Sequence, residues 1–359
     1  MTSLRVLSCM ATLVAGLASS LAAQDYPPKD WWVHLYDGSI EKLERIPIER
    51  PHVLTPIPIV RPAPPRFQAF YPFAGRPGVD AEGEFLYSNA GCLNRPMWIT
   101  HNNHGLVLVC QEDATMKILD GAAAIVTPGW SGINTGIPVG GPLLSLPPLR
   151  TVLEWVQNVG PSGDLIRGEE YGNSAQWVSI NPVTQNTLRG LALDLRERVW
   201  AVNDDGVAWF NARDGKATAV IGPGAKTPTG SPFVPVAVGC DPLVDQTYVA
   251  SATAVYLVDE ANRALVSIAG SPDKAGKDDG SLGQGLFSSI TSIAVHDSGW
   301  ILVVDDGHLR WVSPSGVIST QPALTPFGFY NLDTVFQVVF DRDMALLSDP
   351  YKHVIWRVF

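Results

Sequence analysis

The sequence lacks the motifs on which most enzyme classes depend. It has no Cys-x-x-Cys pair, so neither a thiolate zinc site nor a thioredoxin-type site is supported. It has no Gly-x-Ser-x-Gly nucleophile elbow, no phosphate-binding loop and no dinucleotide fingerprint. Its carboxylates are spread among turn-like segments, so no pair of acids stands out for acid–base catalysis. These absences argue against the common catalytic classes.

The chain has few charged residues, and fewer basic than acidic ones. Charged residues make up 17% of the 359-residue chain, the formal net charge is −10, and no long basic run occurs. An acidic surface repels phosphate backbones, so we expect no nucleic-acid partner. Hydrophobic residues make up 46% of the chain, which is a balance typical of a globular protein with a substantial core.

Residues 1–23 have the pattern of a signal peptide. Arg5 supplies a positive charge, an apolar stretch follows from Leu7 to Leu17, and small residues at Ser20 and Ala22 form a cleavage site. An uncleaved N-terminal anchor is the alternative. No other apolar stretch reaches the length of a membrane span. We therefore expect a secreted or periplasmic protein with no membrane span after cleavage.

Residues 24–65 are expected to form an aromatic and proline-rich N-terminal arm. Seven prolines lie between Pro47 and Pro65, and proline lacks the N–H that a central strand needs. The remaining residues, 66–359, consist of short apolar runs separated by Gly, Asp, Asn and Pro clusters. This pattern predicts an all-β domain.

One repeating unit is clear over residues 265–313. A Leu-x-x-Ile-Ala-Gly segment ends at Gly270 and is followed by a loop with Asp279-Gly280. Three strand-like segments come next: Thr291–Val295, Trp300–Asp305 and His308–Ser313. This order of segments resembles the NHL repeat, although Ile290-Thr291-Ser292 replaces the usual Pro-x-Gly. Weaker matches begin at Tyr71, Leu188 and Phe336, and the resemblance implies a β-propeller.

The spacing of the repeats predicts six blades. The residues that open the expected inner strands are Trp98, Leu191, Ala237, Ile293 and Val338. They are separated by 93, 46, 56 and 45 residues. Because 93 is about twice 46, we expect one more unit near residues 140–180. Four-stranded blades of this period are typical of a propeller. Since the last unit ends after its third strand, we expect residues 66–70 to pair with the C-terminal strand and close the ring.

Histidines are the first candidate site residues. Some NHL propellers are lyases that hold zinc at the central channel, and a zinc site needs three or four ligands on one rim. His101, His104 and His296 follow expected inner strands and are the candidate metal ligands. The alternative is that they are solvated turn residues.

Acidic runs suggest calcium as a second metal. They are Asp204-Asp205-Gly206, Asp278-Asp279-Gly280 and Asp305-Asp306-Gly307. None has the alternating oxygen ligands of a calcium loop, and Asp-Gly is a good hairpin turn. We therefore expect no cofactor, with zinc or calcium as the alternatives. The glycine-rich run Val139–Pro142 is interpreted as an ordinary turn.

Tryptophan and cysteine give two further predictions. Most of the eleven Trp fall in expected strands and fit packing between blades, while Trp31, Trp32 and Trp130 lie in expected loops and are candidate binding residues. Cleavage of the leader leaves three cysteines. Either Cys92 and Cys110 form a disulfide, or all three stay unpaired.

Taken together, the residues favour a secreted propeller that acts as a non-enzymatic binding scaffold for an unknown protein or carbohydrate. The alternative is an enzyme with a metal-dependent lyase or hydrolase site at the mouth of the channel. A structural protein of the outer envelope is a third option. Fold alone does not choose among them.

Overall fold

The structure of the chain is a computed structural model. It describes residues 32–34, 40–42, 60–75, 77, 93–101, 106–112, 116–120, 126–128, 139–146, 151–157, 163–169, 178–179, 188–211, 216–326 and 331–359. The chain divides into two units, Met1–Val60 and Arg61–Phe359. In the first unit, strands β1 (Trp32–His34) and β2 (Ile40–Lys42) form an antiparallel pair.

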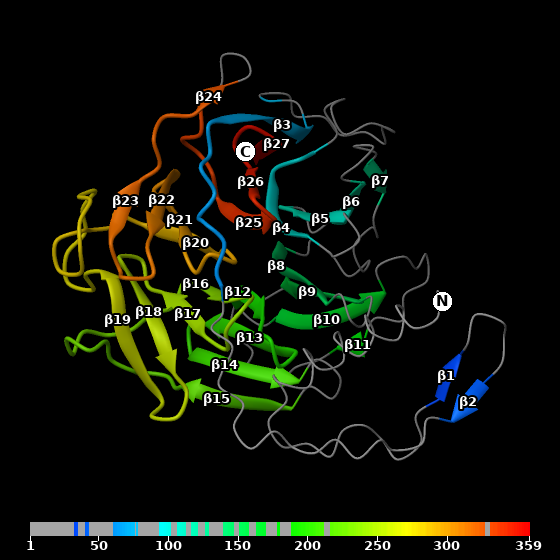
Figure 1. The fold of residues 1–359 in the computed structure, drawn as a ribbon, viewed down its shortest axis with the longest axis horizontal. Coiled ribbons are helices and arrows are strands. Elements are labelled where there is room, and N and C mark those ends of the chain that lie inside the picture. Colours follow the sequence, from blue (N-terminus) through cyan, green and yellow to red (C-terminus); the bar gives the residue numbers. More distant parts are fainter. Residues whose placement is uncertain are drawn as a thin grey trace, which may run out of the picture. The chain divides into compact units, whose positions relative to one another are not determined.

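The described part of the second unit consists of six β-sheets, which follow one another along the chain (Figure 1). The first sheet contains β4 (Pro96–His101), β5 (Leu106–Gln111), β6 (Met116–Asp120) and β7 (Val126–Pro128). The second contains β8 (Val139–Leu146), β9 (Thr151–Gln157), β10 (Gly163–Glu169) and β11 (Val178–Ser179). The third contains β12 (Leu188–Leu193), β13 (Arg198–Asn203), β14 (Gly206–Asn211) and β15 (Ala217–Ile221).

The other three sheets follow the same plan, with one change in the last. The fourth contains β16 (Ala237–Cys240), β17 (Thr247–Ala250), β18 (Ala254–Asp259) and β19 (Ala264–Gly270). The fifth contains β20 (Ile290–Val295), β21 (Ile301–Asp305), β22 (His308–Val312) and β23 (Ile318–Thr320). The sixth contains β25 (Gln337–Asp341), β26 (Met344–Asp349), β27 (Val354–Val358), β3 (Ala69–Gly75) and β24 (Thr325–Pro326).

Local sequence explains the hairpins within these sheets. Strands β21 and β22 are joined by Asp306 and Gly307, which both have positive φ angles of 50° and 75°. A two-residue loop of this kind is the turn whose twist matches the strands on either side, and Asp-Gly favours it. The prediction that this Asp-Gly pair forms a hairpin turn is confirmed.

The core lies between neighbouring sheets. One buried cluster joins the fifth and sixth sheets through Trp311 and Trp356, and another joins the third and fourth through Trp200 and Tyr256. The fifth sheet is covered on both faces, by the sixth sheet and by the fourth, so its second strand is buried on both sides, as the burial of Ile301–Asp305 in β21 shows. The interpretation of tryptophans as packing residues between sheets is confirmed for these three.

The first strands of the sheets face one another at the centre of the second unit (Figure 1). Each contacts the first strands of two other sheets, in the cyclic order β4, β8, β12, β16, β20, β25 and back to β4. Among the described residues there is no helix, and so none that is long and apolar enough to cross a membrane.

The C-terminal strand pairs with a strand from the other end of the second unit, as the sequence predicts. β27 lies between β26 and β3, with Val358 opposite Phe70 and Val354 opposite Gly75. The paired strand was expected at residues 66–70, but β3 is Ala69–Gly75. It ends at Gly75, whose φ is +83° and where a Cβ would lie 2.2 Å from the carbonyl oxygen of His353. Glycine therefore lets the two chain segments approach.

One strand differs from the prediction made from the sequence. The glycine-rich run Val139–Pro142 predicts a turn, but these residues begin β8. The register of β8 against β9 shifts between Gly140 and Leu143, which is a bulge that accommodates Gly and Pro on an edge strand. The unit expected near residues 140–180 is present as the second sheet.

Loss of β27 should damage the whole second unit. Trp356 is completely buried, donates from Nε1 to Asp349 Oδ2 at 3.1 Å and packs edge-on against Phe70. We expect Trp356→Ala to lower the free energy of unfolding by about 3–5 kcal/mol, measured by urea denaturation. Deletion of residues 353–359 should abolish cooperative unfolding. The control Tyr351→Ala, at a 70% exposed side chain, should change stability by less than about 0.5 kcal/mol. Equal effects of Trp356→Ala and Tyr351→Ala would contradict this account.

Candidate ligand cavity

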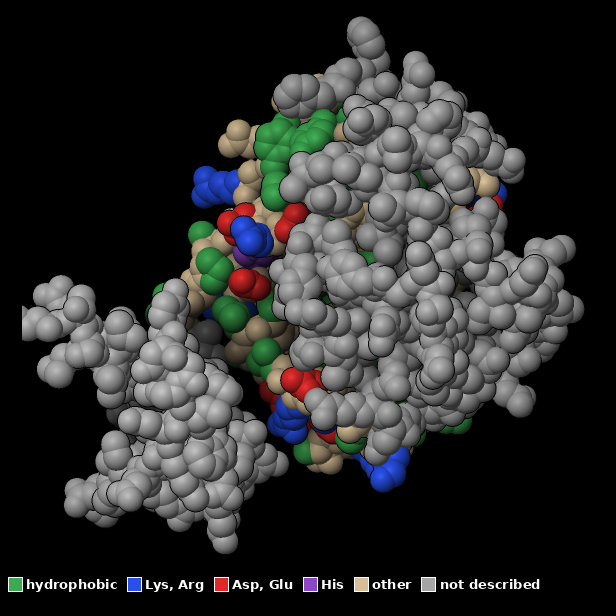
Figure 2. Space-filling model, turned by 90° about the vertical axis from the view of Figure 1, so that its right-hand side faces the viewer, with side chains coloured by type: hydrophobic (Ala, Val, Ile, Leu, Met, Phe, Trp, Pro, Cys, Tyr) green, Lys and Arg blue, Asp and Glu red, His purple; other side chains and the backbone are tan. Residues whose placement is uncertain are grey.

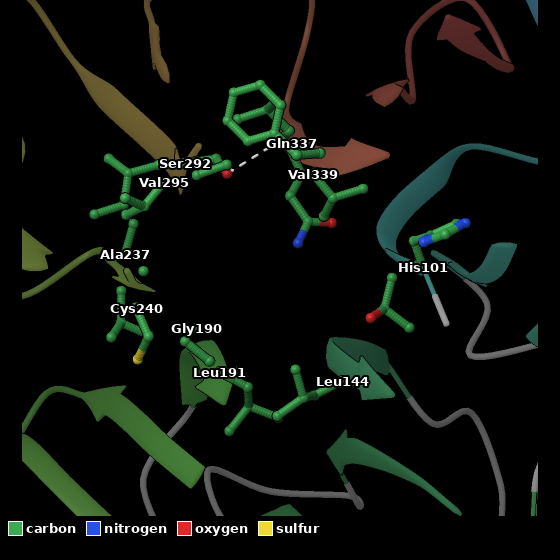
Figure 3. A pocket seen from close by; sticks show the side chains of 18 of the residues that line it. His101, Leu144, Gly190, Leu191, Ala237, Cys240, Ser292, Val295, Gln337 and Val339 are labelled. Carbon is green, nitrogen blue, oxygen red and sulfur yellow. Dashed lines mark hydrogen bonds between the residues drawn. The ribbon is translucent and has the colours of Figure 1, made fainter. Parts of the chain in front are cut away.

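A cavity of about 950 Å³ lies where the first strands of the sheets meet (Figure 3). All six first strands contribute to its wall, through residues such as Thr100, Leu144, Leu191, Ala237, Ser292 and Gln337. Clefts of roughly 300–1,000 Å³ are the size of small-molecule sites in proteins. The cavity is therefore the candidate functional site.

One side of the cavity is held together by polar side chains that link neighbouring sheets. Ser292 Oγ of β20 accepts a hydrogen bond from the backbone N–H of Val338 in β25, at 3.2 Å. Gln337 Oε1 of β25 accepts one from the N–H of Ile99 in β4, at 2.5 Å.

The next link in the same direction is made by Thr100. Its Oγ1 accepts a hydrogen bond from the N–H of Ser145 in β8, at 3.1 Å. In all three links a side chain of one first strand satisfies an N–H of the next first strand. A first strand is the edge of its own sheet, and a buried N–H without a partner is costly. The three links therefore give hydrogen-bond partners to N–H groups on the open edges of these strands.

The other side of the cavity is apolar and closely packed. A Cβ built on Gly190 of β12 would lie 3.3 Å from the backbone nitrogen of Val238 in β16. A Cβ on Gly239 of β16 would lie 3.2 Å from Cγ2 of Val295 in β20. Glycine at these positions brings the strands close together. Figure 3 shows Leu144 and Leu191 on this side, across the cavity from Gln337.

A histidine and a carboxylate meet at the wall of the cavity. His101 Nε2, at the end of β4, lies 3.5 Å from Oδ1 of Asp341, and Arg357 Nη2 lies 3.8 Å from Oδ2 of the same carboxylate. Burial lowers the pKa of His101 and outweighs the Asp341 carboxylate, which acts to raise it. The positive charges of Arg357 and Arg342 lower that pKa further. His101 is therefore held mainly in its neutral form.

Cys240 also lines the cavity, but its thiol is a poor nucleophile. Burial raises the pKa of this thiol far above its usual range, and Thr247 Oγ1 lies 3.6 Å from Sγ. The thiolate is the reactive form of cysteine, so a thiol held in the protonated state does not favour nucleophilic catalysis.

The two described candidate zinc ligands have different surroundings. His101 lines the cavity, whereas His296 is 2% exposed, is not among the lining residues, and has Nε2 3.4 Å from Oδ1 of Asp343. The Nδ1 of His296 accepts from the N–H of Ser298 at 3.0 Å, and its ring packs against Phe340. His104 lies outside the described residues. No group of three or more His, Cys, Asp or Glu able to hold a metal occurs among the described residues, and zinc binding remains a prediction.

The other predicted site residues are largely out of view. Trp31, Trp130 and Cys92 lie outside the described residues, and for Trp32 only the backbone of β1 is described. Cys110 is buried in β5. Binding by the three tryptophans and the Cys92–Cys110 disulfide therefore remain predictions.

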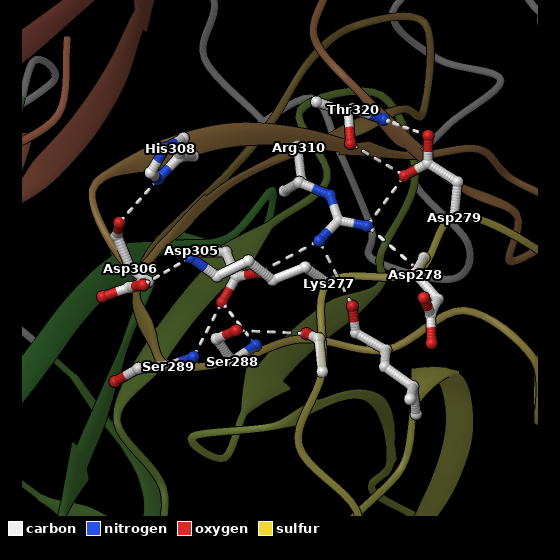
Figure 4. Close-up of polar contacts among 12 residues, drawn as sticks. Lys277, Asp278, Asp279, Ser288, Ser289, Asp305, Asp306, His308, Arg310 and Thr320 are labelled. Atoms are coloured by element: carbon white, nitrogen blue, oxygen red, sulfur yellow. Dashed lines mark hydrogen bonds and ion pairs between the residues drawn. The ribbon is translucent and has the colours of Figure 1, made fainter.

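Two of the acidic runs are part of a structural network (Figure 4). Arg310 is 2% exposed and donates to Asp305 Oδ2 at 3.1 Å and to Asp279 Oδ1 at 2.8 Å. Asp305 Oδ1 also accepts from the backbone N–H groups of Ser288 and Ser289, at 2.8 and 2.7 Å. These carboxylate oxygens fix the loop before β20 to the hairpin after β21, and calcium binding by the acidic runs stays an untested alternative.

The described part of the surface seen in Figure 2 carries charges of both signs. In Figure 2, acidic and basic side chains of the described residues lie next to one another, with apolar side chains between them. On this face the described residues form no basic stripe of the kind that a phosphate backbone needs.

Comparison with known proteins defines the class of fold. Neither known protein families nor curated proteins match the sequence. Among solved structures, a protein of unknown function from Bacteroides thetaiotaomicron VPI-5482 is similar, with 15% identity, a TM-score of 0.62, and coverage of 80% of this chain and 75% of that chain.

Two further similar structures carry a description of function. An auxiliary nutrient binding protein from the same strain has 11% identity and a TM-score of 0.62, over 81% of this chain and 76% of that chain. An auxiliary nutrient binding protein from Bacteroides ovatus ATCC 8483 has 11% identity and a TM-score of 0.61, over 82% and 77%. At such identities the likeness concerns the fold alone. The chain has an all-β fold of the β-propeller type.

The residues that link the first strands were not singled out in the sequence. Ser292, Gln337 and Thr100 are common polar residues in short apolar strands, and each of their partners lies at least 45 residues away. The only local signal is that a polar side chain occurs in a short strand that also carries apolar residues. That signal indicates a strand but not what its polar side chain contacts.

Stability should depend on the protonation of His101. Its pKa in the folded protein lies below its ordinary value of 6.5, so the unfolded chain takes up the proton more readily. The free energy of unfolding is therefore unaffected above this pH and falls as the pH drops below it. His101→Gln should lose less thermal stability than the parent between about pH 7.5 and 5.5. His308→Gln, at an exposed site, is the control. An identical loss in parent and His101→Gln would contradict the prediction.

The Arg310 network should contribute to stability without calcium. Arg310→Met leaves the buried Asp305 carboxylate without its cation, and we expect a loss of about 3–5 kcal/mol in the free energy of unfolding. The control Arg189→Met breaks an exposed ion pair with Asp204 and should cost about 0–1 kcal/mol. Added calcium should leave the Tm of the parent protein unchanged. A calcium-dependent rise in Tm would show that the acidic runs bind the ion.

Proposed function

We propose that this chain is an exported six-bladed propeller of NHL-like repeats that binds a small molecule in its central cavity and catalyses no reaction on it. Its leader would be removed on export to the periplasm or the medium. The observation that carries the proposal is the cavity of about 950 Å³, which has an apolar wall on one side and hydrogen-bonding side chains on the other. Sites for small molecules combine these two properties.

Several observations support the six-bladed ring. The six described sheets follow one another in the chain, their first strands contact in cyclic order, and β27 is paired with β3 from the other end of the unit. In this proposal each sheet is one blade and the β3–β27 pair closes the ring. Closure would leave the sixth blade without an open edge at β27.

The comparisons support binding rather than a particular ligand. Two structures of the same fold are described as auxiliary nutrient binding proteins. Because fold does not determine function, the proposal takes from them only that such a fold is used for binding. The N-terminal Trp31 and Trp32, together with Trp130, would contribute a second surface for a protein or carbohydrate partner.

The second candidate is an enzyme at the cavity, and one observation favours it. His101 lies against the Asp341 carboxylate in the cavity wall and is held neutral, as a general base must be. Together with His104 and His296 it would form the zinc site of the metal-dependent version. The buried turn in which His296 is engaged argues against that version, and the protonated Cys240 thiol supplies no nucleophile.

A cavity-filling substitution tests the proposed function. Leu191 lines the cavity, and Leu191→Trp would occupy part of its volume. Leu195, 52% exposed and away from the cavity, gives the matched control Leu195→Trp. We expect small molecules retained from a metabolite extract, and detected by mass spectrometry, to be lost with Leu191→Trp and kept with Leu195→Trp. Retention of the same compounds by both variants would refute binding in the cavity.

A further inference from the structure

The three side chains that link the first strands have spare hydrogen-bond donors. A Ser or Thr hydroxyl has one donor besides its acceptor lone pairs, and a Gln amide nitrogen carries two. In Ser292, Thr100 and Gln337 the oxygen is used to accept a backbone N–H. Within the part of the chain that the structure describes, the hydroxyl hydrogens and the amide Nε2 of these three have no acceptor.

These donors lie on one side of the cavity. Ser292, Gln337 and Thr100 belong to β20, β25 and β4, whose sheets are neighbours, and all three line the cavity. Figure 3 shows the nitrogen of Gln337 directed into the cavity, and its orientation is fixed because Oε1 is held by Ile99. Because Oε1 is bonded to the neighbouring strand, it is the amide nitrogen of Gln337 that a ligand in the cavity would contact.

Charge at the wall is compatible with an anion. The cavity is lined by Arg189, Arg342 and Arg357 and by two carboxylates, Asp297 and Asp341. Arg189 is paired with Asp204 and Arg357 lies near Asp341, so the charges at the wall are close to balanced, although the whole chain carries −10. Asp341 is already in contact with His101 and Arg357, so it is not a strong acceptor for a ligand.

We propose that the ligand is a carboxylate with an apolar body, bound with its oxygens at Ser292, Gln337 and Thr100 and its body against Leu144, Leu191 and Val295. A carboxylate only accepts hydrogen bonds, and it matches a wall on which the hydroxyl hydrogens of Ser292 and Thr100 and the amide nitrogen of Gln337 are available as donors. A sugar hydroxyl donates as well as accepts, and its donors would have to use the second lone pairs of the Ser292 and Thr100 oxygens, so a sugar matches this wall less closely than a carboxylate does. This inference rests on the proposed function, because it names the ligand class of the same cavity.

The probes for this inference come in matched pairs. Benzoate, hexanoate and naphthoate are each compared with the corresponding primary alcohol, and glucose and maltose represent polyols. Binding to the full chain is measured by isothermal titration calorimetry near neutral pH. We expect naphthoate to bind with a Kd of about 1 mM or tighter, and its alcohol at least about tenfold more weakly.

The decisive variant is Gln337→Glu. Glutamate keeps an oxygen that accepts from Ile99 N–H, so the hydrogen bond between the sheets is retained. It replaces the amide donor that faces the ligand by a negatively charged oxygen, which would repel a carboxylate. Carboxylate binding should weaken by about 10- to 100-fold. The control Gln284→Glu makes the same chemical change at an exposed loop, where Oε1 accepts from Ser281 Oγ, and should leave binding unchanged. A thermal melt of both variants shows that the fold is intact.

The outcomes separate this inference from the proposed function. Absent carboxylate binding, or binding that Gln337→Glu leaves unchanged, overturns the carboxylate assignment. Tighter binding of glucose or maltose than of the carboxylates, lost in Leu191→Trp, overturns the assignment while the cavity remains the binding site. Carboxylate binding that persists in Leu191→Trp overturns both, because the ligand would then bind elsewhere.

Discussion

The structure depends on how the open edges of the first strands are satisfied. Each sheet begins with a strand that has a neighbour on one side only, and its other edge faces the centre of the unit. Backbone N–H groups buried there need partners, because each one left unsatisfied is costly. Side chains of the adjacent sheet supply them: Ser292 for Val338, Gln337 for Ile99, and Thr100 for Ser145. These contacts join successive sheets by hydrogen bonds as well as by apolar packing.

The same constraint divides the cavity into two halves. Where neighbouring first strands are linked by polar side chains, the wall carries hydroxyl groups and the amide nitrogen of Gln337, which is directed into the cavity (Figure 3). Where glycine takes the place of such a side chain, as at Gly190, a Cβ would lie only 3.2 to 3.3 Å from Val202 and Val238, and the wall is apolar. Gly190 and Ser292 each follow a register shift against the second strand of their own sheet. At this repeat position the chain thus has a hydrogen-bonding side chain in Ser292 and a close contact in Gly190.

Much of the fold is predictable from the sequence, because its signals are local. The unit at residues 265–313 combines alternating apolar residues with Asp-Gly turns, and its strands lie close to where those signals put them. β8 was missed because Gly140, Gly141 and Pro142 are turn residues that a bulged edge strand also tolerates. The site was not predictable, because Gln337 and Ile99 are 238 positions apart and only tertiary structure brings them together. Histidine is a candidate site residue because it can bind metals and transfer protons. Ser, Thr and Gln occur in many strands, so the sequence does not mark Ser292, Thr100 and Gln337 as site residues.

Hydrogen exchange, resolved to single amides, tests the central claim most directly. The account predicts slow exchange for the N–H groups of Ile99, Ser145 and Val338, although all three belong to first strands next to the cavity. It also predicts that Gln337→Ala accelerates exchange at Ile99 and leaves Val338 protected by Ser292. Exchange at these amides as fast as at open strand edges would contradict the account. So would a Gln337→Ala variant with Ile99 still protected.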